Sequence, residues 1–205
     1  MVQRTSRRVL TSSLLAALWM AVPTVAYAHE NQVIRLGSFW GGFLHPVLGL
    51  DHFLAMISVG IVSSMIGGRA IFTVPGLFVV MMAVGGAAGS ADIGLGTAAI
   101  EIGIAISVVL LGTAIAADRN LPVRAVMAAV VFFGFFHGYA HGSEIPDIAG
   151  PAVYATGFLL GTTLIHLTGV LVGEISRRYS AGRIVLRSIG AGFVVIGVLF
   201  LAGVM

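Results

Sequence analysis

The sequence predicts an all-α membrane protein, a polytopic helix bundle with six transmembrane helices that follow a cleavable signal peptide. Of its 205 residues, 58% are hydrophobic and only 9% are charged, whereas a soluble domain carries about 25% charged residues. So few charges cannot cover a water-facing surface, and most of the chain must therefore face lipid or other helices. Lipid offers no partner to free backbone groups, which makes helices the expected form.

The beginning of the chain, residues 1–28, has the pattern of a secretory signal peptide. Arginines precede an apolar stretch, Val9–Val22, and a small-x-small cleavage site follows at Ala26–Ala28. An uncleaved first spanning helix is the alternative. Cleavage leaves residues 29–205 as one six-helix domain and places His29 at an N-terminus outside the cytoplasm.

Six apolar segments in the remainder are each long enough to cross the hydrocarbon core of a bilayer as a helix. The short stretch before them, Val33–Leu44, is aromatic-rich and is expected to be an interfacial or re-entrant piece broken by Pro46. The expected spans are Gly49–Gly67, Ala70–Gly89, Gly96–Ala117, Val123–Gly142, Pro151–Gly173 and Ile184–Met205.

Arginines gather in alternate loops and so predict the topology. They follow the first, third and fifth spans, and the positive-inside rule places those loops in the cytoplasm. Both mature termini are then periplasmic, as a signal peptide followed by six spans of the bacterial inner membrane also requires. The arginines concerned are Arg69, Arg119, Arg124, Arg177, Arg178, Arg183 and Arg187.

Glycine pairs four residues apart occur in several spans and predict close contact between helices. Small residues at this spacing let two helix backbones approach each other in lipid. The pairs are Gly85/Gly89, Gly138/Gly142, Gly157/Gly161 and Gly169/Gly173.

Ionisable side chains inside the spans are costly and are therefore candidates for function. Because successive spans alternate in direction, most of these groups fall in one layer near the periplasmic side. Outside this layer, His166 lies deeper in the fifth span, where a structural hydrogen bond and a release-side ligand are both open interpretations. The members of the layer are His45, Asp51, His52, Glu101, His137, His141 and Glu144.

This set of side chains suits a metal ion. His137 and His141 are four residues apart and share one helix face. Imidazole and carboxylate ligands suit nickel, cobalt, zinc or iron. The chain has no cysteine, which excludes disulfides and thiolate ligands and argues against a copper(I) site. No run of like charges indicates nucleic-acid binding.

Two motifs resemble the signatures of the HupE/UreJ family. The segment from His45 to His52, HPVLGLDH, is similar to the family pattern H-P-x-x-G-x-D-H. The segment from Phe136 to Glu144, FHGYAHGSE, is similar to the second pattern, F-H-G-x-A-H-G-x-E. Both motifs occur in the expected order, and the resemblance covers essentially the whole mature chain.

The resemblance implies a function. The family comprises hydrogenase and urease accessory proteins regarded as nickel permeases, and the seven residues of the layer match its functional positions or its acidic residue of span three. We therefore expect non-ATP-driven uptake of Ni²⁺ across the inner membrane, with membrane lipid around the protein. Nickel metallochaperones or hydrogenase and urease maturation proteins are the implied partners. A cobalt permease, and a membrane metal chaperone without transport, are the alternatives.

Enzymatic and electron-transfer functions are disfavoured. No P-loop is visible, which argues against direct ATP drive, and no H-E-x-x-H string indicates a metalloprotease. A haem carrier needs axial histidines that face each other across a bundle, and His137 and His141 lie on one helix. We expect no organic cofactor and no enzymatic activity.

Overall fold

The computed structural model describes residues 37–119, 121–145 and 150–204. The expected signal peptide and His29 lie outside these residues. The described ranges form seven α-helices and no strand, so the predicted all-α fold is confirmed. The helices are α2 (Ser38–Leu48), α3 (Leu50–Ile66), α4 (Ala70–Ser90), α5 (Thr97–Ala117), α6 (Val123–Ser143), α7 (Pro151–Arg177) and α8 (Ser180–Leu201).

Five of these helices, α4 to α8, are each long and apolar enough to cross a membrane, and the bent pair of α2 and α3 is a sixth candidate span. The expected first span corresponds to α3, whose 17 residues reach only about 26 Å at 1.5 Å per residue. The hydrocarbon core is about 30 Å thick. Only α2 and α3 together pass as a span, and they are bent by 79° relative to each other.

The bend lies at Gly49. The sequence had predicted a break at Pro46 instead. Pro46 sits inside α2, close to its C-terminal end, where the missing backbone N–H affects one helical hydrogen bond. Gly49 leaves the helical conformation, with φ −78° and ψ 106°. The residues after Pro46 can therefore complete α2 before the chain turns into α3.

The last span also differs from its predicted bounds. We expected Ile184–Met205, whereas α8 begins at Ser180 and ends at Leu201, so that Arg183 lies in the helix together with Arg187. Arg183 Nε lies 3.4 Å from Asp118 Oδ2, and Arg187 Nε donates a hydrogen bond of 3.1 Å to the carbonyl of Ala116. Long arginine side chains can reach such partners from helical positions, which lets the helix extend beyond the apolar segment.

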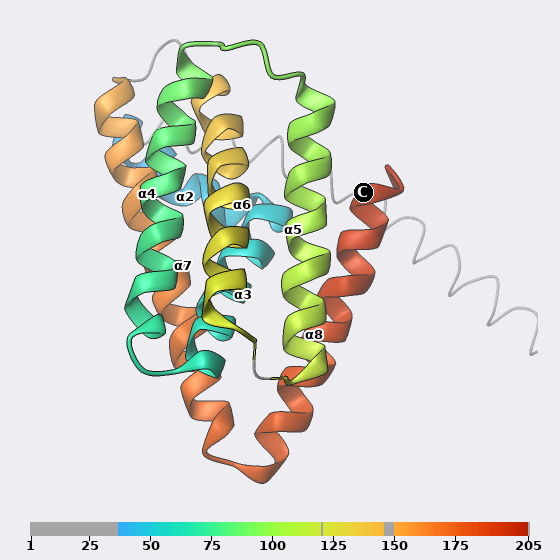
Figure 1. Ribbon diagram of the computed structural model, residues 1–205. Coiled ribbons are helices and arrows are strands. Elements are labelled where there is room, and N and C mark those ends of the chain that lie inside the picture. Colours follow the sequence, from blue (N-terminus) through green and yellow to red (C-terminus); the bar gives the residue numbers. More distant parts are fainter. Residues whose placement is uncertain (1–36, 120, 146–149, 205) are drawn as a thin grey trace, which may run out of the picture.

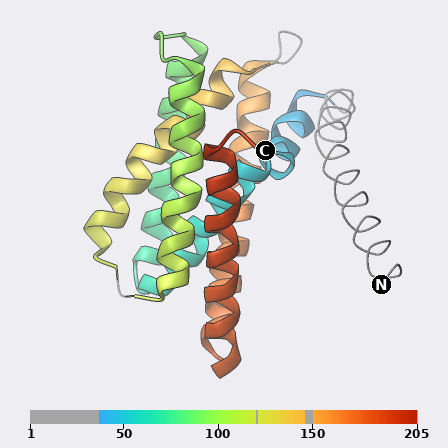
Figure 2. The ribbon, with the colours of Figure 1, turned by 90° about the vertical axis from the view of Figure 1, so that its right-hand side faces the viewer.

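The helices form a bundle around α3, which contacts every other described helix. The α3–α4, α5–α6 and α7–α8 connections lie at the lower end of Figure 1, and α4–α5 lies at the upper end. The hairpin of α7 and α8 projects below the other helices (Figures 1 and 2). All the arginine-rich connections thus lie at one end of the bundle, as the charge pattern predicted.

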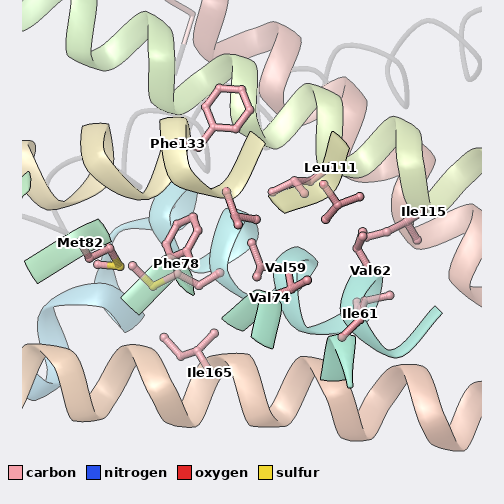
Figure 3. Packing of buried hydrophobic residues seen from close by; sticks show 14 of the residues in the cluster. Val59, Ile61, Val62, Val74, Phe78, Met82, Leu111, Ile115, Phe133 and Ile165 are labelled. Atoms are coloured by element: carbon pink, nitrogen blue, oxygen red, sulfur yellow. The ribbon is translucent and has the colours of Figure 1, made fainter. Parts of the chain in front are cut away.

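A hydrophobic core surrounds α3 in the lower and middle part of the bundle. Figure 3 shows Val59 and Val62 of α3 beside Phe78 of α4 and Leu111 of α5, and all four are buried. Most of α3 between Leu54 and Ser64 is buried, whereas Leu50 at its beginning is exposed. The upper end of α3 begins below the upper ends of α4 and α5 (Figure 1).

Glycines bring α4 and α6 into backbone contact, as the paired spacing predicted. A Cβ atom at Gly85 would collide with the carbonyl oxygen of Phe135, and one at Gly138 would collide with that of Met82. The α3–α7 contact is built in the same way, since a Cβ at Gly169 would collide with the backbone of α3. Small residues therefore fix how closely the helices that carry the polar groups approach each other.

The role of Gly85 can be tested against another glycine of the same helix. We expect Gly85→Ala to lower the unfolding free energy by about 1–3 kcal/mol, the usual consequence of overpacking. Gly76→Ala adds a methyl group where nothing lies within 4 Å, and it should be neutral or stabilising by up to about 1 kcal/mol. Thermal unfolding in detergent measures both, and equal midpoints for the two variants would contradict the close α4–α6 contact.

Candidate metal site

The bend at Gly49 directs two short histidine-bearing segments toward α6. His45 lies in the last turn of α2, and His52 lies in the first turn of α3. The ring centroids of His45 and His141 are 4.7 Å apart, those of His52 and His141 are 4.3 Å apart, and those of His52 and His137 are 5.1 Å apart. These four residues, His45, His52, His137 and His141, are called the histidine cluster below.

Glu144 joins the outer side of the cluster. It is the residue that caps the C-terminus of α6, and it is exposed. His45, His141 and Glu144 each offer one ligand atom, and these three atoms lie within 4.8 Å of one another. Metal–ligand bonds of about 2.0–2.2 Å place two ligand atoms at most about 4.4 Å apart, so small side-chain rotations would close the group on one ion.

Hydrogen bonds fix the tautomers of two cluster histidines. Asp51 Oδ1 accepts hydrogen bonds of 2.8 Å from both the backbone N–H and Nδ1 of His52. His137 Nδ1 donates to the carbonyl of Phe133 at 2.9 Å. In both residues the neutral ring then carries its lone pair on Nε2, and a carboxylate or carbonyl that holds the other nitrogen is the usual support of a metal-binding histidine.

The remaining ring nitrogens are the observation that favours a ligand. His52 Nε2, His137 Nε2 and both ring nitrogens of His141 are buried and have no hydrogen-bond partner among the described residues. A buried polar atom without a partner is unfavourable, and it usually has a specific explanation. Convergent imidazoles with Asp51 and Glu144 beside them fit a borderline divalent cation such as nickel or cobalt.

Two residues of α7 complete the surroundings and were missed by sequence reasoning. The hydroxyl of Tyr154 lies 2.9 Å from His45 Nδ1. The ring of Phe158 lies 4.1 Å from that of His141. Both side chains are buried. They are four residues apart and so share a helix face, but in sequence this pattern does not differ from ordinary packing.

A cavity of about 280 Å³ leads to the cluster between α4, α6 and α7. Its walls include Gly86, Gly138 and Ala152, and it reaches His141 and Tyr154. The small wall residues are some of those that hold α4 and α6 together. The same packing therefore leaves a passage to one of the cluster histidines.

Glu101 lies in the second turn of α5, a helix that contacts both α3 and α6. Its side chain is exposed, and it is not part of the three-residue ligand group found within the described ranges. It occupies the same face of α5 as Ala105 and Val108, and Val108 packs with Leu54 and Ala55 of α3. Glu101 thus stands one turn beyond the α3–α5 contact, and its participation in the site stays a prediction.

Comparison with known proteins agrees with the two histidine motifs. The model of the family described as HupE / UreJ protein matches residues 16–200. The chain is 36% identical over 193 residues to Protein HupE of Rhizobium leguminosarum bv. viciae, and the match covers 94% of this chain and 97% of that protein. No solved structure matches. The chain belongs to the HupE/UreJ family.

Proposed function

We propose that the protein is a secondary permease that takes up Ni²⁺ across the bacterial inner membrane and supplies hydrogenase or urease maturation. The observation that carries the proposal is the set of buried, unpartnered imidazole nitrogens that converge beside Asp51 and Glu144 at a broken span. Membership of a family of hydrogenase and urease accessory proteins supports the choice of metal. The proposed ligands and supporting residues are His45, Asp51, His52, Glu101, His137, His141 and Glu144.

The orientation follows from charge. The cavity at the lower end of the bundle, about 700 Å³ in volume, is lined by Arg119, Arg177, Arg178 and Arg183 with Asp118 as the acidic member. The positive-inside rule assigns this end to the cytoplasm. The histidine cluster then lies toward the periplasm, where it meets the incoming ion.

Transport without ATP is energetically reasonable for a divalent cation. A potential of 100 mV, negative inside, favours entry of two charges by about 4.6 kcal/mol, twice the single-charge value. The cluster compensates the loss of hydration with imidazole nitrogens and with carboxylates that offset the charge of the ion. The same ligands also suit Co²⁺, so the proposal includes cobalt as the alternative cargo.

Removing the proposed ligand group of either His141 or Glu144 should impair capture of the ion. We expect His141→Ala and Glu144→Gln to raise the KM of radioactive nickel uptake by about tenfold or more, since removal of a merely supporting residue already costs about 10-fold to 100-fold in metal affinity. Uptake is measured in cells that lack their own nickel importers, with each variant present in the membrane at the same level as the wild-type protein.

Asp92→Asn is the control for Glu144→Gln. Asp92 lies in the α4–α5 connection at the same end of the bundle and is exposed, so its variant removes one carboxylate charge without touching the cluster. Its uptake should equal that of the wild type. If the His141→Ala variant takes up nickel as well as the wild type does, the proposed site is refuted. If the folded wild-type protein transports neither nickel nor cobalt, a metal chaperone without transport is favoured.

Tyr154 offers a milder test because it acts through His45. Tyr154→Phe removes the hydroxyl that lies 2.9 Å from His45 Nδ1 and keeps the ring. We expect nickel affinity to fall by about tenfold, the lower part of the range for residues that orient a ligand, with little change in thermal stability. Equilibrium binding to purified protein measures this, and an unchanged dissociation constant would show that His45 does not depend on Tyr154.

A further inference from the structure

His166 is a buried histidine that the site described above does not use. It lies in α7, its side chain is only 1% exposed, and neither ring nitrogen has a hydrogen-bond partner among the described residues. The hydroxyl of Thr162, one turn earlier in α7, is fully buried and also lacks a described partner. A histidine kept only for packing would ordinarily have its polar atoms satisfied.

The position of His166 is linked to the histidine cluster along α7. Tyr154, Phe158, Thr162 and His166 recur every four residues and therefore form one continuous stripe on the helix. The outer end of this stripe contacts His45 through Tyr154 and His141 through Phe158. His166 lies eight residues beyond Phe158, which is about 12 Å along the helix axis, toward the arginine-rich end.

A second link runs through Phe78 of α4. The ring of Phe78 is 5.4 Å from that of His137 and 5.1 Å from that of His166. Phe78 is fully buried. The three rings therefore lie in the order His137, Phe78, His166. A single aromatic ring separates the histidine cluster from His166.

We propose that His166, with the hydroxyl of Thr162, is an inner binding step for the transported divalent cation, beyond the histidine cluster on the way to the cytoplasmic end. This rests on the proposed uptake function. A neutral imidazole nitrogen and a hydroxyl oxygen can each donate a lone pair to the ion. The histidine cluster has Asp51 and Glu144 beside it, whereas neither ring nitrogen of His166 has a carboxylate partner among the described residues, so the ion binds more weakly at this inner step. Weak binding is what allows an ion to leave.

The first experiment compares His166→Leu with the wild type in nickel uptake. Leucine preserves apolar bulk and removes both ring nitrogens, so a ligand role predicts a maximal uptake rate about tenfold lower with the same KM, because capture at the cluster is intact. His141→Ala should show the opposite pattern, a raised KM. Thermal stability of His166→Leu should be unchanged or higher, since an unpartnered polar group has been removed from the interior.

The second experiment uses the absence of cysteine from the chain. In the His166→Cys variant the new thiol is the sole one, and a small charged methanethiosulfonate reagent reports whether ions reach it. We expect the reagent to modify this thiol and Cd²⁺ to protect it. An Asp92→Cys variant, at an exposed position of the α4–α5 connection, is the control, whose thiol the reagent should modify and Cd²⁺ should not protect.

The outcomes separate the two proposals. If the His166→Leu variant has the maximal uptake rate of the wild type, the proposal of an inner step is overturned. The proposed site at the histidine cluster is not affected by that result. A lower rate that only follows a loss of folded protein would also overturn the inner step, because that is the behaviour of a structural residue. If the wild type moves no metal at all, the uptake function fails, and protection of the thiol by Cd²⁺ then decides alone whether an inner cation site exists.

Discussion

The break between α2 and α3 is the constraint on which the rest of the site depends. A continuous helix satisfies its own backbone groups in lipid, whereas irregular backbone is tolerated there only where protein or water surrounds it. At the break Gly49 is half-buried between exposed Leu48 and Leu50, while α3 beyond it contacts every other described helix. The break lets the end of one helix and the start of another, with His45 and His52, face α6 together. Discontinuous helices that present groups near the middle of a membrane are a recurring way to build transport sites.

Close helix packing then determines how near the ligands lie to one another. The Gly138 and Gly142 backbone positions rest against Met82 and Gly86 of α4, so α6 is held at a fixed depth against α4. His137 and His141 are interleaved with these glycines in the same turns. The proposed ligands and the residues that pack therefore cannot be separated, and a larger side chain at either glycine would displace the adjacent imidazole as well as the helix.

The parts of this arrangement that local sequence determines could be predicted, and the parts that depend on packing could not. The length of the apolar segments predicted the membrane helices. The two motifs contain the four histidines of the cluster and Glu144 beside them. The bend at Gly49 was assigned to Pro46 because proline is the stronger sequence signal, yet a proline in the last turn of a helix disturbs little. Tyr154 was missed because its partner lies 109 residues away in the chain. Glu101 was expected in the site from its depth and from the acidic residue that the family has in span three, and its participation stays a prediction.

The arginine-rich end also bears on how an ion leaves. The last carbonyl groups of a helix carry partial negative charge and attract cations. In this protein Arg177 donates to the carbonyl of Ser64 near the end of α3, and Arg187 donates to that of Ala116 near the end of α5. In the proposed uptake, these guanidinium groups occupy carbonyls that could otherwise hold a divalent cation as it leaves. In the proposed uptake, carboxylates beside the histidine cluster and arginines on the carbonyls at the inner end would make affinity for the ion fall along the path, while the membrane potential sets the direction of movement.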